Sequence, residues 1–223
     1  GISSSLFDAT TGKEQLQLLL GQSFFLKDRQ VSLIEAEIDT QEQSPISGEL
    51  RLNVIKDWEL SSSFSWDADH NINEANTVSA TYLPGNGRLL QLALHSREQT
   101  QGLNFDERAR SRQSKLSFAM PLKPQWSLLG HWNYNLKEQD TLDANTTLES
   151  YLGVEYENCC LQARLINHRF LRQTDNELKP SQQIMLQLQL KGLANFDDNV
   201  LSIIERTIPG YNERFGSSNS NIH

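Results

Sequence analysis

Apolar and polar residues alternate along most of this chain, and a repeat of two residues is the pattern of β-strands. Residues 58–66 show it clearly, since Trp58, Leu60, Phe64 and Trp66 occupy every second position apart from one serine. Serine and glutamate fill the positions between them. Because successive side chains of a strand point to opposite faces, each such strand has one apolar face and one polar face.

Roughly ten segments of the chain carry this alternation, which predicts an all-β protein. They are residues 14–25, 46–54, 58–66, 77–83, 89–95, 114–120, 126–134, 146–156, 161–170 and 182–191. Most are close to the length of strand that crosses a membrane as part of a barrel.

The connections between these segments alternate in length. Long polar connections are predicted at residues 27–45, 67–76, 96–113, 135–145 and 171–181, and short ones at 56–57, 84–87, 121–125 and 157–160. Outer-membrane barrels have short periplasmic turns, long extracellular loops and aromatic residues near the strand ends. The sequence therefore predicts an antiparallel transmembrane β-barrel segment of about ten strands, with short periplasmic turns and long extracellular loops.

A short helix is predicted after the last strand, in a tail that the loop rhythm places on the periplasmic side. Asp197 or Asp198 would cap it, and Pro209 would end it. Its apolar residues are Val200, Leu201, Ile203 and Ile204. We therefore expect barrel strands over residues 1–193, a periplasmic tail over 194–215 and a disordered end over 216–223.

The composition argues against several classes of protein. A formal net charge of −8 does not suit a nucleic-acid-binding protein, which would need a basic face. No run of about 18 apolar residues is present to form a transmembrane helix. The five histidines have no metal-binding spacing, so no metal or cofactor is expected. No signal peptide is visible at Gly1, which suggests a mature chain or a piece of a longer one.

Catalysis is not expected either. The sequence contains no Gly-x-Ser-x-Gly elbow, no Cys-His pair at a catalytic spacing and no glycine-rich phosphate loop. A catalytic group assembled from distant strands is left open by the sequence.

The two cysteines of the chain, Cys159 and Cys160, are adjacent and lie in the predicted turn at 157–160. Neighbouring residues of a strand face opposite ways, and a disulfide between them would close a strained ring. We therefore expect each thiol to have a partner elsewhere. The loop rhythm places the turn in the periplasm, where disulfides persist. The alternative is a pair of reduced, buried cysteines that act as small apolar residues.

With these residues in view, the chain resembles the C-terminal part of the LptD family of outer-membrane lipopolysaccharide assembly proteins. The resemblance covers nearly the whole chain. Its most specific stretches are Leu-Gly-Val-Glu-Tyr-Glu-Asn-Cys-Cys at 152–160, the final strand at 186–193 and Glu-Arg-Thr-Ile-Pro-Gly-Tyr at 205–211. Adjacent cysteines in a barrel turn are rare, which makes the first stretch the most telling.

The resemblance implies a role and a set of partners. The barrel would assemble lipopolysaccharide into the outer leaflet, and Cys159 and Cys160 would form disulfides to cysteines near an N-terminal periplasmic domain absent from this chain. The implied partners are an LptE-like lipoprotein plug, lipopolysaccharide, a periplasmic LptA-like bridge, the barrel-assembly machinery and outer-membrane lipids. The last strand would form one side of a lateral gate and carry the assembly signal, with Ile184, Leu186, Leu188, Leu190 and Gly192.

Other charged residues leave two interpretations open. The basic group in a predicted extracellular loop would bind lipopolysaccharide phosphates or be solvated; it comprises Arg108, Arg110, Arg112 and Lys115. The charged residues of the polar face would line a solvated lumen or contact the plug or lipopolysaccharide head groups; they are Glu49, Arg51, Glu59, Glu149 and Arg164.

Three other classes of protein compete with this interpretation. A general porin-like barrel has the same loop rhythm, an outer-membrane hydrolase would need a catalytic group that the sequence does not reveal, and a soluble β-sandwich would have to bury the outward leucines. The adjacent cysteines and the structured tail favour the lipopolysaccharide assembly protein over all three.

Overall fold

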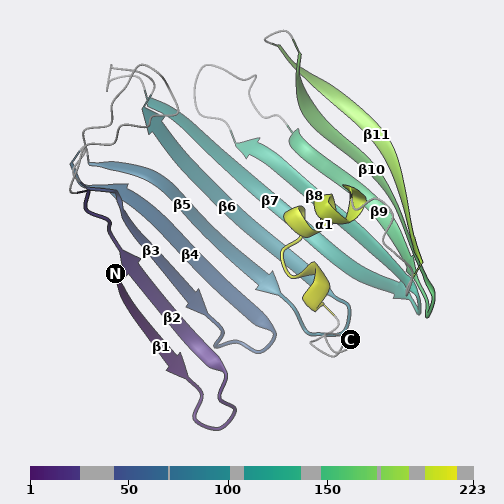
Figure 1. Ribbon diagram of the computed structural model, residues 1–223, viewed down its shortest axis with the longest axis horizontal. Helices are drawn as coiled ribbons and strands as arrows, with labels where there is room; N and C mark the ends of the chain where they lie inside the picture. The colour runs from purple at the N-terminus through teal and green to yellow at the C-terminus, as the bar shows by residue number, and fades with distance from the viewer. Residues whose placement is uncertain are drawn as a thin grey trace.

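The computed structural model describes residues 1–25, 43–69, 71–100, 108–136, 147–174, 177–190 and 199–214, which form one antiparallel sheet of eleven strands and a short C-terminal tail (Figure 1). The strands are β1 (Ile2–Phe7), β2 (Glu14–Gly21), β3 (Ile46–Leu52), β4 (Trp58–Asp67), β5 (Ile72–Tyr82), β6 (Leu89–Thr100), β7 (Arg108–Lys123), β8 (Trp126–Leu136), β9 (Thr147–Glu157), β10 (Leu161–Thr174) and β11 (Glu177–Leu190). The tail consists of α1 (Asn199–Thr207) and the 3-10 turn η1 (Tyr211–Glu213).

The strands follow one another in chain order, so each pairs with its neighbours in sequence and β1 and β11 form the two edges. Figure 1 shows the sheet bending around the tail, as a segment of barrel wall does. The predicted all-β, antiparallel fold is confirmed. The strand that the prediction missed is β1, because its serine run, Ser3 to Ser5, carries no apolar alternation.

Several strands run further than their hydrophobic pattern. Strand β5 already begins at Ile72, and β6 and β7 leave only residues 101–107 between them. The β10–β11 ladder continues to the pair Thr174 and Glu177. The long loops predicted at 67–76, 96–113 and 171–181 are therefore wrong in extent. The ladder needs only backbone groups, so it continues where apolar side chains stop.

The tail lies on one face of the sheet, here called the inner face, and the opposite face is called the outer face (Figure 1). Helix α1 ends at Thr207, two residues before Pro209, which agrees with the predicted stop. The proposed caps Asp197 and Asp198, the boundary near residue 193 and the predicted disordered end at 216–223 lie outside the described residues.

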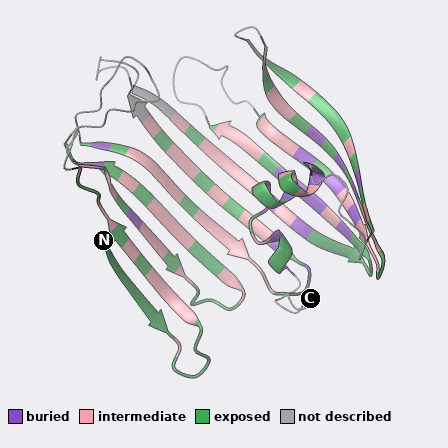
Figure 2. Cartoon of the chain, viewed as in Figure 1, coloured by how far each residue is buried: buried purple, intermediate pink, exposed green. Residues whose placement is uncertain are grey.

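Burial differs between the two faces. Figure 2 shows exposed residues recurring along the strands, with the buried positions gathered mainly beneath the tail. On the outer face, Ile184 and Leu186 of β11 are 73% and 64% exposed. A surface that faces water does not normally expose large apolar side chains to this extent.

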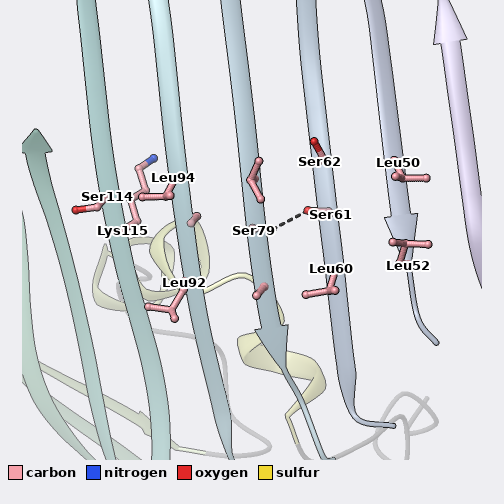
Figure 3. A pocket seen from close by; sticks show the side chains of 13 residues that line it. Leu50, Leu52, Leu60, Ser61, Ser62, Ser79, Leu92, Leu94, Ser114 and Lys115 are labelled. Atoms are coloured by element: carbon pink, nitrogen blue, oxygen red, sulfur yellow. Dashed lines mark hydrogen bonds between the residues drawn. The ribbon is translucent and has the colours of Figure 1, made fainter. Parts of the chain in front are cut away.

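A shallow groove on the outer face of β3 to β7 illustrates its apolar character (Figure 3). Its volume is about 480 Å³, and Leu60, Leu92 and Leu94 are among the side chains that line it. No helix among the described residues is long and apolar enough to cross a membrane.

Candidate functional site

An apolar row crosses the inner face of the last six strands. Its members are direct cross-strand neighbours, one from each of β6 to β11: Leu89, Ala119, Leu129, Gly153, Ile166 and Met185. The tail residues Val200, Ile204 and Ile208 join four of them in one buried cluster. The row is therefore the binding surface for the tail, and burial of its side chains supplies most of the driving force.

Glycine is required at the centre of this row. A Cβ added to Gly153 would lie 2.5 Å from Cγ2 of Ile166 and 2.7 Å from the Leu165 carbonyl oxygen. The carbonyl belongs to the backbone and has no rotamer by which to move away. The absence of a side chain at Gly153 lets β9 and β10 pair closely beneath the tail.

A buried ionic cluster lies next to the apolar row, on the side of the short turns. Its centre is the Glu155 carboxylate, which is 1% exposed. Arg164 donates from Nε to Glu155 Oε2 at 2.8 Å, and Tyr211 and Arg214 of the tail also donate to this carboxylate. Arg164 also donates from Nη1 to Gln187 Oε1 of β11 at 2.9 Å. One carboxylate thus joins β9, β10 and the tail.

The end of the tail is fixed by further contacts. The Arg214 guanidinium lies 3.7 Å from the centre of the Tyr211 ring and donates to the Tyr211 carbonyl oxygen at 2.9 Å. Gly87, in the turn between β5 and β6, donates from its backbone to the Arg214 carbonyl oxygen at 2.8 Å. Burial raises the pKa of the Tyr211 hydroxyl to about 12, against the opposing effect of the Arg214 guanidinium. Tyr211 is therefore a neutral donor at any ordinary pH.

A row of polar residues lies on the other side of the apolar row from the ionic cluster. Ser117 donates from Oγ to the Thr207 carbonyl oxygen at 2.7 Å, and Tyr151 forms a 2.8 Å hydrogen bond with Thr207 Oγ1. Because the single proton of Ser117 is donated to Thr207, His131 must donate from Nδ1 to Ser117 Oγ in their 2.9 Å contact. These bonds satisfy the end of α1, where helix carbonyls have no partner within the helix.

This Ser–His pair does not form a hydrolytic site. Ser117 is 1% exposed, the tail covers it, and its proton is committed to the Thr207 carbonyl. A catalytic serine needs an accessible oxygen whose proton passes to the histidine. The part of the chain that the structure describes also holds no group of three or more His, Cys, Asp or Glu side chains placed to bind a metal ion.

Glu149 links the polar row of Ser117, His131 and Tyr151 to helix α1. Its Oε1 accepts from His168 Nε2 at 2.9 Å and from Arg206 Nη2 of α1 at 3.2 Å. Glu149 and Arg164 thus belong to the binding surface for the chain's own tail. Neither predicted role for them, a solvated lumen wall or a contact with another molecule, describes these two residues.

The remaining charged residues of the predicted polar face lie away from the tail. Glu49 and Arg51 form an ion pair at 2.6 Å with 33% and 48% of their side chains exposed. Glu59 is also exposed. These residues fit the prediction of a solvated inner wall.

The sequence also contained a signal for the surface that binds the tail, although the alternation of apolar and polar residues by itself does not reveal it. Members of the apolar row follow or precede apolar outer-face residues, which doubles the apolar position; examples are Leu89-Leu90, Leu128-Leu129, Leu165-Ile166 and Ile184-Met185. A strand with water on its polar face has no need of such doublets.

The two cysteines occupy the centre of a tight turn between β9 and β10. Asn158 donates from its backbone to the Leu161 carbonyl oxygen at 2.9 Å, and its side-chain Oδ1 accepts from the backbones of Cys160 and Leu161 at 2.9 and 2.7 Å. Cys159 and Cys160 are both exposed, and their sulfurs lie 2.6 Å apart.

The turn therefore changes the expected geometry of the cysteines. They do not point to opposite faces, because they are turn residues and not strand residues. The alternative of two buried thiols is wrong. Their exposure agrees with the expectation that each thiol is accessible to a partner.

The predicted basic group is divided between the two faces of the sheet. It lies in β7 and not in a loop, so Arg112 and Lys115, three residues apart, point to opposite faces. Arg112 is exposed and pairs in register with Ser96, while Lys115 lies on the inner face opposite Asn133. The side chains of Arg108 and Arg110 lie outside the described part of the structure.

The predicted gate residues follow one edge of the sheet. Ile184, Leu186, Leu188 and Leu190 are all exposed on the outer face of β11. Gly192 falls outside the described residues.

Comparison with known proteins identifies the class and then the family. A curved antiparallel sheet with an apolar outer face and a tail bound to its inner face is a segment of barrel wall. The family model described as LPS transport system D, LptD, matches residues 1–126. The chain therefore belongs to the LptD family, a family of transport proteins and not of enzymes.

Curated relatives match the chain almost from end to end. The LPS-assembly protein LptD of Alcanivorax borkumensis is 33% identical over 218 residues, which cover 96% of this chain and 27% of that protein. The proteins of the same name from Xylella fastidiosa strain 9a5c and Nitrosococcus oceani are 28% and 27% identical over 94% and 96% of the chain. The chain spans about a quarter of the length of these relatives.

Proposed function

We propose that this chain forms the C-terminal part of an outer-membrane barrel that assembles lipopolysaccharide into the outer leaflet. The family match over residues 1–126 carries the proposal, because the relatives that match nearly the whole chain are named LPS-assembly proteins. The exposed leucines of the outer face support a membrane location, since a lipid-facing barrel wall needs an apolar band. The rest of the barrel would come from parts of the full-length protein outside this chain.

The turn between β9 and β10 would be the covalent attachment point within this barrel. The proposal is that Cys159 and Cys160 form disulfides to cysteines in a periplasmic domain of the full-length protein. Both thiols are exposed at the end of the sheet that has the short turns, which is the periplasmic end in barrels of this kind. The tail would lie on the same periplasmic side, since β11 ends there.

The uncovered part of the inner face would receive the lipoprotein plug. The tail occupies the inner face of the later strands, whereas the inner face of β3 to β5 carries polar groups such as the Ser61–Ser79 hydrogen bond and the Glu49–Arg51 ion pair. An LptE-like partner would contact this region. An LptA-like bridge would act through the periplasmic domain, and β11, as an edge strand, would form one side of the gate and be recognised by the barrel-assembly machinery.

The test uses the full-length protein that contains this chain. Cys159→Ser with Cys160→Ser should abolish the slowly migrating oxidised form on non-reducing electrophoresis and reduce lipopolysaccharide at the cell surface. The unmodified protein should require detergent for extraction from the membrane, and heating should change its migration on electrophoresis. An unchanged oxidised form together with unchanged surface lipopolysaccharide would reject the proposal.

A further inference from the structure

One row of the outer face changes from apolar to polar as it crosses the sheet. From β4 to β8 the row runs through the direct neighbours Leu60, Ala80, Leu92, Leu116 and Trp132. On the next three strands it continues through Ser150, Arg169 and Gln182. Asn167, the next outer-face residue of β10, is also polar. The other outer-face residues near this point on β9 to β11 are mostly leucine, isoleucine and valine, so the polar positions form a distinct patch.

A groove of about 370 Å³ lies at this patch. Trp132 forms one wall, Gln182 forms another, and Ser150 and Arg169 lie between them. Thr147 also lines the groove and accepts a hydrogen bond from Trp132 Nε1 at 3.2 Å. The groove of Figure 3 is lined by leucines, by serines and by Lys115. Lys115 belongs to the inner face, whereas Arg169 lies on the outer face in the present groove.

The cation in this groove is available to a ligand. Arg169 is exposed, and within the described part of the chain its guanidinium makes no hydrogen bond or ion pair. Beside it, Gln182 donates from Nε2 to Asn167 Oδ1 at 2.8 Å, which leaves the second N–H of this amide for a ligand. An arginine with five free donors suits a bidentate phosphate ligand better than any neutral group.

The surroundings of the groove indicate a lipid as the source of that phosphate. The Trp132 and Tyr134 rings lie 5.4 Å apart beside it, and aromatic residues of this kind mark the level of lipid head groups in barrels. On the side of the short turns the outer-face residues other than Asn167 are mostly apolar, and Leu152, Leu165 and Leu186 among them are exposed. A molecule with a phosphate at one end and acyl chains at the other matches both halves of this surface.

We propose that Arg169, with Ser150 and Gln182, forms a binding site on the outer face for the phosphate of a glycolipid whose acyl chains lie along Leu152, Leu165 and Leu186. The proposal rests on the proposed function, since it places the site at the head-group level of the outer leaflet beside the gate strand β11. It adds a docking position outside the barrel wall for a phosphate-bearing glycolipid.

The experiment uses the full-length protein in detergent and native mass spectrometry with bisphosphorylated lipid A as the probe. Arg169→Gln should weaken binding of the lipid about tenfold, as loss of a charge-assisted hydrogen bond does. The matched control is Arg88→Gln, which removes the same charge from an exposed position in the turn between β5 and β6. It should leave the affinity within about twofold of the unmodified protein.

Two further measurements identify the ligand chemistry. Lipid A stripped of its phosphates should bind the unmodified protein as weakly as intact lipid A binds the Arg169→Gln protein. Inorganic phosphate at millimolar concentration should not compete, because it lacks the acyl chains. Competition by phosphate, or retained binding of the stripped lipid, would overturn the lipid site.

Equal losses for Arg169→Gln and Arg88→Gln, or no loss for Arg169→Gln, would also overturn the inference. These outcomes are separable from failure of the proposed function. If surface lipopolysaccharide depends on the full-length protein while Arg169→Gln binds lipid A normally, the function stands and this site is rejected. If surface lipopolysaccharide does not depend on the protein, the proposed function itself fails.

Discussion

Glu155 and Arg214 are separated by 59 residues in the chain and form a buried ion pair between β9 and the tail. Their side chains are 1% and 2% exposed, so both groups have left water completely. A charge in such a place is tolerated only when it is paired and hydrogen-bonded. The carboxylate meets this condition through Arg164 and Tyr211 as well, which makes it specific for one docked position of the tail.

The ion pair predicts that Glu155→Gln releases the tail. The change removes the carboxylate charge that Arg164 and Arg214 both contact in the buried cluster, and breaking a buried pair in this way costs about 3–5 kcal/mol. Trypsin should then cleave after Arg214, which is inaccessible in the docked tail. Glu205→Gln is the control, because Glu205 is exposed on α1 and, among the described residues, hydrogen-bonds only to Asn212 on the tail surface. Equal cleavage rates for the two variants would contradict the role of Glu155.

The apolar row predicts a large effect at Ile204. This side chain is fully buried between α1 and the sheet, so Ile204→Ala leaves a cavity and should destabilise the docked tail by about 2–5 kcal/mol. Hydrogen exchange of the α1 amides measures the free energy of tail opening directly. Glu205→Ala, which removes an exposed side chain of the same helix and its hydrogen bond to Asn212, should change it by no more than about 1 kcal/mol. Similar exchange in both variants would mean that α1 is not held by this surface.

Because β9 and β10 pair closely beneath the tail, Gly153→Ala should destabilise the protein more than an ordinary surface substitution does. The new Cβ would meet the Leu165 carbonyl oxygen and the Ile166 side chain, and overpacking of this kind costs about 1–3 kcal/mol. The temperature at which the folded band disappears on electrophoresis should fall. Leu152→Ala changes the neighbouring outer-face residue, which is 57% exposed, and should leave that temperature nearly unchanged in detergent. A higher folded-band temperature for Gly153→Ala would contradict the close approach seen here.

The pKa of Tyr211 predicts alkaline sensitivity of the tail. Burial raises this pKa to about 12, whereas an exposed tyrosine ionises near 10. The stabilisation from the neutral hydroxyl is therefore complete below pH 10 and is lost as the pH rises to about 12. The phenolate absorbance difference between the unmodified protein and Tyr211→Phe should show a titration midpoint of about 12. A midpoint near 10 would mean that the tail is not docked under those conditions.

Strand positions were well predicted by the sequence, because alternation reflects a physical constraint that acts within each strand. Residues 58–66 and β4 (Trp58–Asp67) agree almost residue for residue. Strand ends were predicted less well, as β10 and β11 show, since backbone pairing continues without apolar side chains. The orientation of Cys159 and Cys160 was also missed, because neighbouring side chains face opposite ways only within a strand, whereas both cysteines lie in the predicted turn, which the Asn158 side chain closes.

The sequence by itself determined that this chain is a series of antiparallel strands with one apolar face, followed by a short helix. It also held the doubled apolar positions, such as Leu128-Leu129 and Leu165-Ile166, that mark a covered part of the inner face. Only the tertiary structure decided what covers it. Register across six strands brings Leu89 into line with Met185, and the tail then buries that row together with Glu155 and Arg164. Such contacts depend on the sum of many strand pairings, whereas alternation along one strand reports only which face a residue occupies.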